Sequence, residues 1–301
     1  EAEALNTRMT SLKDTTGYSD MLLKHQQLKM RLTEIGDQIA GMQDAAVKGP
    51  YHFNQGNRHL KAGSYQDAID SYNKATSFEP GNAQYYYNLG LAYQFNRQST
   101  EALVAYKSAI EKNANYTGAY IAAGNVEVSL NQYEEALEHY NQAVYLDPFN
   151  ADAHHGKGNV YLKKRQFPEA AASFKEAVDN DSNAGDSWVN LGRAYQEQNK
   201  SSEAIKALEK AVTLKLKNSY KQQAYYYLAS AYNAVGSHSK AITAAESCLK
   251  LKANYAAAWY EKGFALMKMG KKKEAEAAFN EASKDAAWKS VAGAQIKILN
   301  Q

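Results

Sequence analysis

The chain has 301 residues, of which 45% are hydrophobic and 22% are charged, and its formal net charge at pH 7 is +3. Only four prolines and eighteen glycines argue against a β-rich or disordered chain, and the abundance of helix-forming residues favours an all-α fold. Basic and acidic residues are interspersed, so no basic stripe indicates a nucleic-acid partner. The single cysteine, Cys248, excludes an internal disulfide and a cysteine-based metal cluster. No stretch reaches the roughly eighteen apolar residues of a membrane span.

Residues 1–48 lack the pattern of the remaining chain, and we expect two helices there. The first helix is short and rests on three apolar residues at helical spacing, namely Leu5, Met9 and Leu12. The stretch TTGYSD at 15–20 predicts a break, with Ser19 or Asp20 as the N-cap of the second helix.

The second helix carries apolar residues spaced alternately by four and three, which is typical of the a/d seam of a coiled coil over about two heptads. These residues are Leu28, Leu32, Ile35, Ile39 and Met42. Two interpretations stay open, because a firm coiled-coil prediction needs about three to four heptads. The segment either forms a coiled coil that makes the protein oligomeric, or it folds back to cap the helices that follow or docks on another chain.

From residue 49 onward the sequence repeats with a period of 34 residues, and YYNLGLAY at 86–93 recurs as WVNLGRAY at 188–195. Small residues keep this spacing at three positions. They are Gly56, Gly90, Gly124, Gly158 and Gly192; Ala68, Ala102, Ala136, Ala170 and Ala204; and Ala75, Ala109, Ala143, Ala177 and Ala211. Three additional residues near 219–221 interrupt the phase, which then resumes. The repeat predicts seven units, at 49–82, 83–116, 117–150, 151–184, 185–218, 222–255 and 256–289.

Each unit contains two amphipathic stretches joined by a short polar turn, which predicts an antiparallel helix pair. We expect the small residues to mark the closest contacts, with Gly90 against Ala102 inside a unit and Ala109 against the next unit. One unit cannot bury its apolar face alone, so stacked units would form a right-handed α-solenoid with a concave face. Residues 290–301 would add a C-terminal capping helix.

These motifs resemble the tetratricopeptide repeat family, in which an aromatic residue, Leu-Gly, Tyr, Ala, a second aromatic residue, Ala and Pro stand at fixed places in 34 residues. The similarity covers about four-fifths of the chain. The closing proline is kept only as Pro80 and Pro148. The resemblance implies a scaffold that binds other proteins.

A search for catalytic chemistry finds no metalloprotease motif, glycine-rich phosphate loop or nucleophile elbow. The seven histidines are scattered along the chain. We therefore predict neither enzymatic activity nor a cofactor nor a metal site.

The resemblance further implies that the first helix of each unit lines a peptide-binding groove. Carried over to this sequence, the groove residues are Phe53, Asn54, Asn57, Tyr87, Asn88, Leu91, Phe95, Asn125, His155, Asn159, Asn190, Arg193, Tyr226, Tyr260 and Phe264. Asparagine is a weak helix former, and a row of amides offers donors and acceptors to the backbone of an extended peptide. The alternative is that these amides bond each other or the preceding helical turn.

Some family members bind the acidic C-terminal tail of chaperones through a clamp of asparagines and basic residues. Asn57 with Asn88, and Asn159 with Asn190, match its asparagines, but Phe53 and other residues replace its lysines. We therefore expect no recognition of a dicarboxylate chaperone tail.

The function predicted from the sequence is a non-catalytic scaffold that binds a peptide segment or helix of another protein in its groove. The alternative is an assembly subunit that oligomerises or docks through its N-terminal helices and convex face. We expect a soluble protein, with the cytoplasm favoured. Export to the periplasm stays open, because the sequence starts at Glu1 and an upstream targeting segment could precede it.

Overall fold

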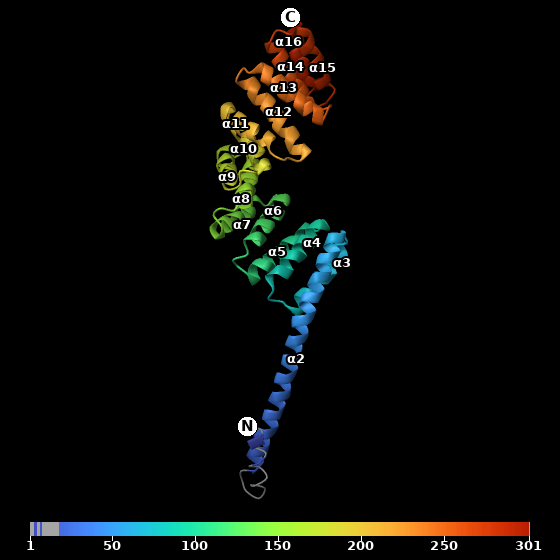
Figure 1. Ribbon diagram of the computed structural model, residues 1–301, viewed down its shortest axis with the longest axis vertical. Coiled ribbons are helices and arrows are strands. Elements are labelled where there is room, and N and C mark those ends of the chain that lie inside the picture. The colour runs from blue at the N-terminus through green and yellow to red at the C-terminus, as the bar shows by residue number, and fades with distance from the viewer. Residues whose placement is uncertain (1–2, 5–6, 8–17, 301) are drawn as a thin grey trace. The chain divides into compact units, whose positions relative to one another are not determined.

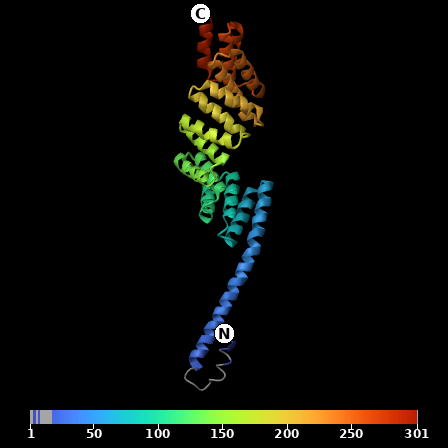
Figure 2. The ribbon, with the colours of Figure 1, turned by 60° about the vertical axis from the view of Figure 1, so that its left-hand side comes forward.

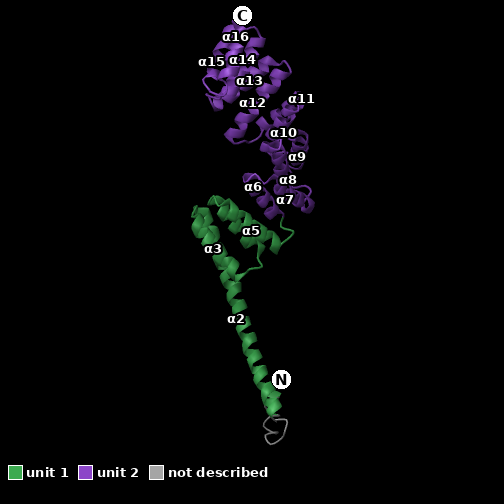
Figure 3. Ribbon diagram, turned by 180° about the vertical axis from the view of Figure 1, so that it is seen from behind, with its two compact units in different colours: residues 1–116 green, residues 117–301 purple. Residues whose placement is uncertain are grey.

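The computed structural model describes residues 3–4, 7 and 18–300, and these residues form fifteen α-helices and no strand (Figure 1). The all-α prediction is therefore confirmed for the described part of the chain. The chain divides into two compact units, residues 1–116 and residues 117–301 (Figure 3).

Unit 1 consists of a long helix followed by three short ones. They are α2 (Tyr18–Ala62), α3 (Tyr65–Phe78), α4 (Ala83–Phe95) and α5 (Ser99–Lys112). Helix α2 packs on α3, α3 on α4, and α4 on α5. This unit therefore holds two antiparallel helix pairs, the first of which is completed by the C-terminal part of α2.

Helix α2 passes through the expected boundary between residues 48 and 49 without a break, and Pro50 lies inside it. A proline normally interrupts a helix because it lacks an N–H and because its ring clashes with the preceding turn and with the Cβ of the residue before it. The residue before it is Gly49, which has no Cβ and so relieves part of that clash. The helix continues, and one element serves both the N-terminal segment and the first repeat.

The start of α2 differs from the sequence prediction. The helix begins at Tyr18, so Ser19 and Asp20 lie inside its first turn and the N-cap prediction is wrong. The carboxylate of Asp20 there complements the partial positive charge of the helix N-terminus instead. The short helix expected from Leu5, Met9 and Leu12 falls outside the described residues.

The N-terminal part of α2 projects beyond α3 to α5 rather than folding back on them (Figures 1 and 2). Its apolar side chains between residues 32 and 42 are 45% to 69% exposed. No described element of unit 1 therefore caps this stretch.

Unit 2 contains eleven helices that alternate between the first and second helix of a repeat. They are α6 (Thr117–Ser129), α7 (Tyr133–Leu146), α8 (Ala151–Lys163), α9 (Phe167–Asn180), α10 (Gly185–Glu197), α11 (Ser201–Thr213), α12 (Asn218–Ala234), α13 (His238–Leu251), α14 (Ala256–Lys268), α15 (Lys272–Ser283) and α16 (Lys289–Leu299). Helix α12 starts early and absorbs the extra residues at 219–221 as an additional helical turn. Helix α16 packs on α15 through Ala292, Ile296 and Leu299.

Most of the repeated glycines face a ring of the second helix in their own repeat, whereas Gly192 faces Leu208 there. A Cβ on Gly90 would lie 2.6 Å from Tyr106, and one on Gly158 would lie 2.7 Å from Phe174. Tyr106 and Phe174 are fully buried. The nearest neighbour of Gly90 is thus an aromatic side chain, and its expected contact with Ala102 stays a prediction. The glycines are small because a whole ring fills the gap between the helices, and burying such a ring contributes about 1.5–3 kcal/mol.

The turns inside the repeats use the left-handed backbone region. Arg97, Asn131, Arg165 and Asn199 have φ between 59° and 63°, and Gly63, Gly236 and Gly270 occupy the same place in the other repeats. This conformation lets the next amide reverse direction and bond the last helical turn, as when Gln98 N donates to Tyr93 O at 2.9 Å. The second helix can thus start within two or three residues.

Candidate functional site

The aromatic residues expected to line the groove are largely used for packing within the repeats. In four repeats the ring of the fifth residue of the repeat, which lies on the first helix, contacts the second-helix ring that packs on the repeated glycine. The pairs, with their centroid distances, are Phe53–Tyr72 at 5.8 Å, Tyr87–Tyr106 at 5.6 Å, His155–Phe174 at 5.4 Å and Tyr260–Phe279 at 5.5 Å. Tyr226 contacts Tyr227 and Tyr255, and Phe264 contacts His238. These rings hold the first helices in place and leave only part of their surface exposed.

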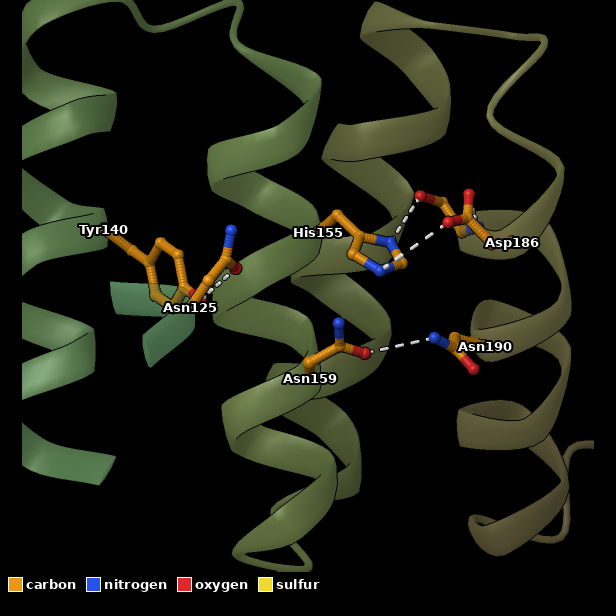
Figure 4. Close-up of polar contacts among 7 residues, drawn as sticks. Asn125, Tyr140, His155, Asn159, Asp186 and Asn190 are labelled. Carbon is orange, nitrogen blue, oxygen red and sulfur yellow. Dashed lines mark hydrogen bonds and ion pairs between the residues drawn. The ribbon is translucent and has the colours of Figure 1, made fainter. Parts of the chain in front are cut away.

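The asparagines form amide pairs between successive repeats. In unit 1, Asn57 Oδ1 accepts from Asn88 Nδ2 at 3.0 Å and from the Tyr72 hydroxyl at 2.7 Å. In unit 2, Asn190 Nδ2 donates to Asn159 Oδ1 at 3.1 Å (Figure 4). In these two pairs the asparagine amides therefore bond each other, which is the alternative to peptide binding that the sequence left open. Each pair leaves one NH₂ group and one carbonyl oxygen for other partners.

Asn125 has a different partner, because Gly156 stands where the next repeat would supply an asparagine. Its Oδ1 accepts from the Tyr140 hydroxyl at 2.7 Å (Figure 4). Tyr140 is 1% exposed, and its ring lies between Gly124 and Gly156. Asn125 itself is exposed, so its NH₂ group faces outward.

One amide pair borders a hollow of about 490 Å³ in unit 2, which we call the groove site. It is lined by the first helices of successive repeats, α6, α8, α10 and α12. The lining residues are Val128, Asn159, Leu162, Lys163, Asn190, Arg193, Ser219, Tyr220 and Gln223. The structure therefore brings three predicted groove residues together, Asn159, Asn190 and Arg193.

The groove site has basic side chains with unused hydrogen-bonding capacity. Arg193 Nε is buried and has no hydrogen-bond partner among the described residues. Burial raises the pKa of Tyr227, and the Arg193 guanidinium opposes that rise. Lys163 is exposed at the rim. Burial also raises the pKa of Tyr220, with a smaller contribution from Asp186, so Tyr220 is a neutral hydroxyl at pH 7. The Arg193 side chain as a whole is half-buried and lines the hollow, so a ligand there would meet its exposed part rather than the buried Nε.

A second hollow of about 500 Å³, on α13 to α15, lacks this feature. Its half-buried lysine, Lys262, forms an ion pair with Glu246 at 2.8 Å, and Lys271 Nζ lies 3.6 Å from the Glu274 carboxylate. These charges already have partners in the folded chain. The groove site is therefore the better candidate for a ligand.

His155 belongs to a polar cluster beside the groove site. Its Nδ1 lies 2.7 Å from Ser187 Oγ, and its Nε2 lies 4.0 Å from Asp186 Oδ2 (Figure 4). The pKa of His155 is lowered chiefly by burial, against the opposing effect of Asp186 and Asp152. Serine, histidine and aspartate are the residues of a hydrolytic triad, but Ser187 is only 2% exposed and cannot meet a substrate in this conformation. The cluster joins α8 to α10.

The other predicted groove residues lie outside the groove site. Phe95 is 56% exposed and stacks on Tyr65 at 5.5 Å, and Asn54 is exposed on α2. Leu91 is half-buried on α4. Tyr220 could not be predicted from the sequence, because it belongs to the three inserted residues that lie outside the 34-residue repeat. Lys163 was not selected either, although it lies on the same first helix, α8, as Asn159.

Two further features are absent from the part of the chain that the structure describes. There, no three histidine, cysteine, aspartate or glutamate side chains are grouped closely enough to hold a metal ion. Among the described helices, none combines the length and the apolarity that crossing a bilayer requires.

Comparison with family models matches this architecture. A tetratricopeptide repeat model matches residues 83–116, 151–183, 185–218, 222–255 and 256–284, more than half of the chain. A second model, described as a TPR repeat, matches residues 56–96 and 124–164. The chain belongs to the tetratricopeptide repeat family, and the predicted all-α repeat solenoid is confirmed. Proteins of this family in general mediate protein–protein interactions and are non-catalytic.

The similar proteins include a curated relative and several solved structures. The small glutamine-rich tetratricopeptide repeat-containing protein of Dictyostelium discoideum is 36% identical over 71 residues, which are 24% of this chain and 21% of that protein. The match thus spans about a fifth of the relative's length.

Among solved structures, YrrB is described as a TPR protein with an unusual peptide-binding site. It is 27% identical with a TM-score of 0.55, over 60% of this chain and 91% of YrrB. PilF of Pseudomonas aeruginosa has a TM-score of 0.62 at 15% identity, over 72% of this chain and 96% of that chain, and shares the fold.

Proposed function

We propose that the chain is a scaffold that binds an extended segment of another protein in the groove site. The observation that carries this proposal is the hollow in which the half-buried Arg193 lies beside the Asn159–Asn190 amide pair. The likeness to YrrB, whose description names a peptide-binding site, supports the same role.

The chemistry of the groove site indicates how the segment would be held. The NH₂ group of Asn159 and the Oδ1 of Asn190 can bond a peptide backbone, which presents one donor and one acceptor per residue. The guanidinium of Arg193 and the ammonium of Lys163 favour a carboxylate, so the segment would carry an acidic side chain at this point. This arrangement differs from the chaperone-tail clamp, because its charges stand at other positions of the repeats.

The proposal is tested with a displayed library of random 12-residue peptides and the full chain. Peptides that bind are synthesised and cross-linked to two variants that carry a photoreactive benzoylphenylalanine. One variant has it at Gln223 in the groove site, and the control has it at Lys206, an exposed residue of α11.

We expect binders enriched in Asp or Glu that cross-link at position 223 and not at position 206. A library that yields no binder, or binders that cross-link only at position 206, would contradict a peptide-binding groove site.

A further inference from the structure

Helix α2 carries an apolar seam that nothing described in unit 1 covers. Between residues 21 and 46 the seam positions follow one another by four and three residues without interruption, over about three and a half heptads. They are Met21, His25, Leu28, Leu32, Ile35, Ile39, Met42 and Ala46, of which only His25 is polar. Leu32 is 60% exposed, Ile35 45%, Ile39 50% and Met42 69%. The continuous helix thus extends the two heptads that the sequence indicated into a seam long enough for a stable pairing.

The charges beside this seam all have the same sign. The spacing places Met21, Leu28, Ile35 and Met42 at d positions, which fixes the flanking e and g positions. Those positions hold Leu22, Lys24, Lys29, Arg31, Gly36, Gln38, Gln43 and Ala45. The three charged residues among them are basic and exposed. The acidic residues of this stretch stand at the outer c and f positions, as when Asp44 pairs with Lys48 at 2.9 Å.

This charge pattern bears on what covers the seam. In a parallel pair of identical helices, g of one helix faces e of the other, which sets Lys24 opposite Lys29. In an antiparallel pair, e faces e and g faces g, and no acidic residue is available at either. Self-pairing therefore brings no opposite charges together in either orientation, whereas a partner with acidic flanks satisfies all three basic residues.

The period of the seam distinguishes a partner helix from a lipid surface. A strict 3.5-residue period drifts by about 20° per heptad on a straight helix, so over its length the seam winds around α2. A helix that supercoils with α2 can follow this path, but a flat surface cannot. A Cβ added to Gly36 or Gly41 would meet no neighbouring atom within 4 Å, so no described residue packs on this part of the helix.

We propose that α2 docks an amphipathic helix of another protein whose apolar stripe has the same period and is flanked by Glu or Asp. This site is independent of the groove site, and it would give the scaffold a second attachment point.

The probes for the test are two designed peptides of four heptads with Ile at a and Leu at d. One has Glu at every e and g position, and the other has Lys there. Binding of each labelled peptide to the full chain is measured by fluorescence anisotropy at low and physiological salt. We expect the Glu peptide to bind at least tenfold more tightly than the Lys peptide, with a difference that shrinks as salt rises.

Two variants of the full chain separate the contributions of charge and apolar surface. K24E/K29E/R31E should reverse the preference, so that the Lys peptide binds more tightly. I35N/I39N should abolish binding of both peptides. Because these side chains are exposed, neither variant is expected to alter the folding of the repeats, which circular dichroism checks. K206E, which reverses an exposed charge on α11, serves as the unaffected control.

Three results would overturn the proposal. The first is absent or equal binding of the two peptides to the unmodified chain. The second is a dimer of the chain alone that I35N/I39N dissociates in sedimentation, which would assign the seam to a second copy. The third is binding to vesicles of phosphatidylcholine and phosphatidylglycerol that I35N/I39N abolishes while neither peptide binds, which would assign it to a membrane surface.

Discussion

The Tyr140 ring offers a direct test of why the repeats need small residues. A Cβ on Gly124 would lie 2.8 Å from the ring, and a Cβ on Gly156 would have three ring carbons at 2.8 Å or less. The ring is therefore held between two glycines of neighbouring helices and cannot retreat from one without meeting the other. Overpacking of this kind costs about 1–3 kcal/mol. Moving the ring would also strain its hydrogen bond to Asn125, which contributes about 1 kcal/mol.

We expect Gly156→Ala to lower the free energy of unfolding by about 1–3 kcal/mol, after a gain of about 1 kcal/mol from the better helix propensity of alanine. In a Tyr140→Ala background the obstructing ring is gone, so the same substitution should stabilise by about 1 kcal/mol. Urea unfolding followed by circular dichroism measures the four free energies. Gly293→Ala, where a Cβ would meet no atom within 4 Å, is the matched control and should stabilise in both backgrounds. An equal effect of Gly156→Ala in both backgrounds would refute the reasoning.

Two other substitutions test the polar contacts of the first helices. Asn57→Ala removes the acceptor of both the Tyr72 hydroxyl and Asn88 Nδ2, so urea unfolding should show a loss of about 1–3 kcal/mol; no loss would mean that these donors find water instead. Burial raises the pKa of Glu261 above its ordinary value, against hydrogen bonds from Asn233 and Ser230 that lower it. Its protonated form therefore favours the folded state, and that contribution is lost as the pH rises from about 4.5 through the raised pKa. Glu261→Gln should accordingly increase the melting temperature at pH 7 relative to the unmodified chain, with a difference that decreases towards pH 4. A difference that is the same at both pH values would contradict this account of Glu261.

Much of the fold could be predicted from the 34-residue repeat, because small and aromatic residues at this spacing indicate stacked helix pairs. The helix pairs of unit 2 begin and end close to the expected unit boundaries. The start of the first repeat could not be placed from the sequence, since Pro50 normally marks a helix start, whereas α2 continues through it. The sequence also did not show that the Tyr106 ring is the nearest neighbour of Gly90, because periodicity identifies equivalent positions but not which side chain reaches across.

The sequence predicted which helices line the groove, but not which of their side chains come together in the groove site. The family resemblance selected Asn159, Asn190 and Arg193 together with residues such as Phe53, whose ring packs on Tyr72 and Tyr85. Whether a side chain at a groove position is free or already bonded depends on contacts across repeats, which one sequence does not display. Tyr220 could not be predicted as part of the groove site either, because an inserted residue has no equivalent in the other repeats.

The central claim is that a peptide with an acidic side chain binds at Arg193 in the groove site. Its most direct test is the dissociation constant of a selected peptide, measured by isothermal titration calorimetry for three variants. R193Q and K163Q alter the groove site, and K206Q makes the same lysine-to-glutamine change on α11. Hydrogen bonds to a charged group contribute about 1.5–3 kcal/mol, so R193Q should weaken binding at least tenfold. K163Q should weaken it less, and K206Q should leave it unchanged. Equal affinities for the unmodified chain and R193Q, with both folded, would contradict the claim.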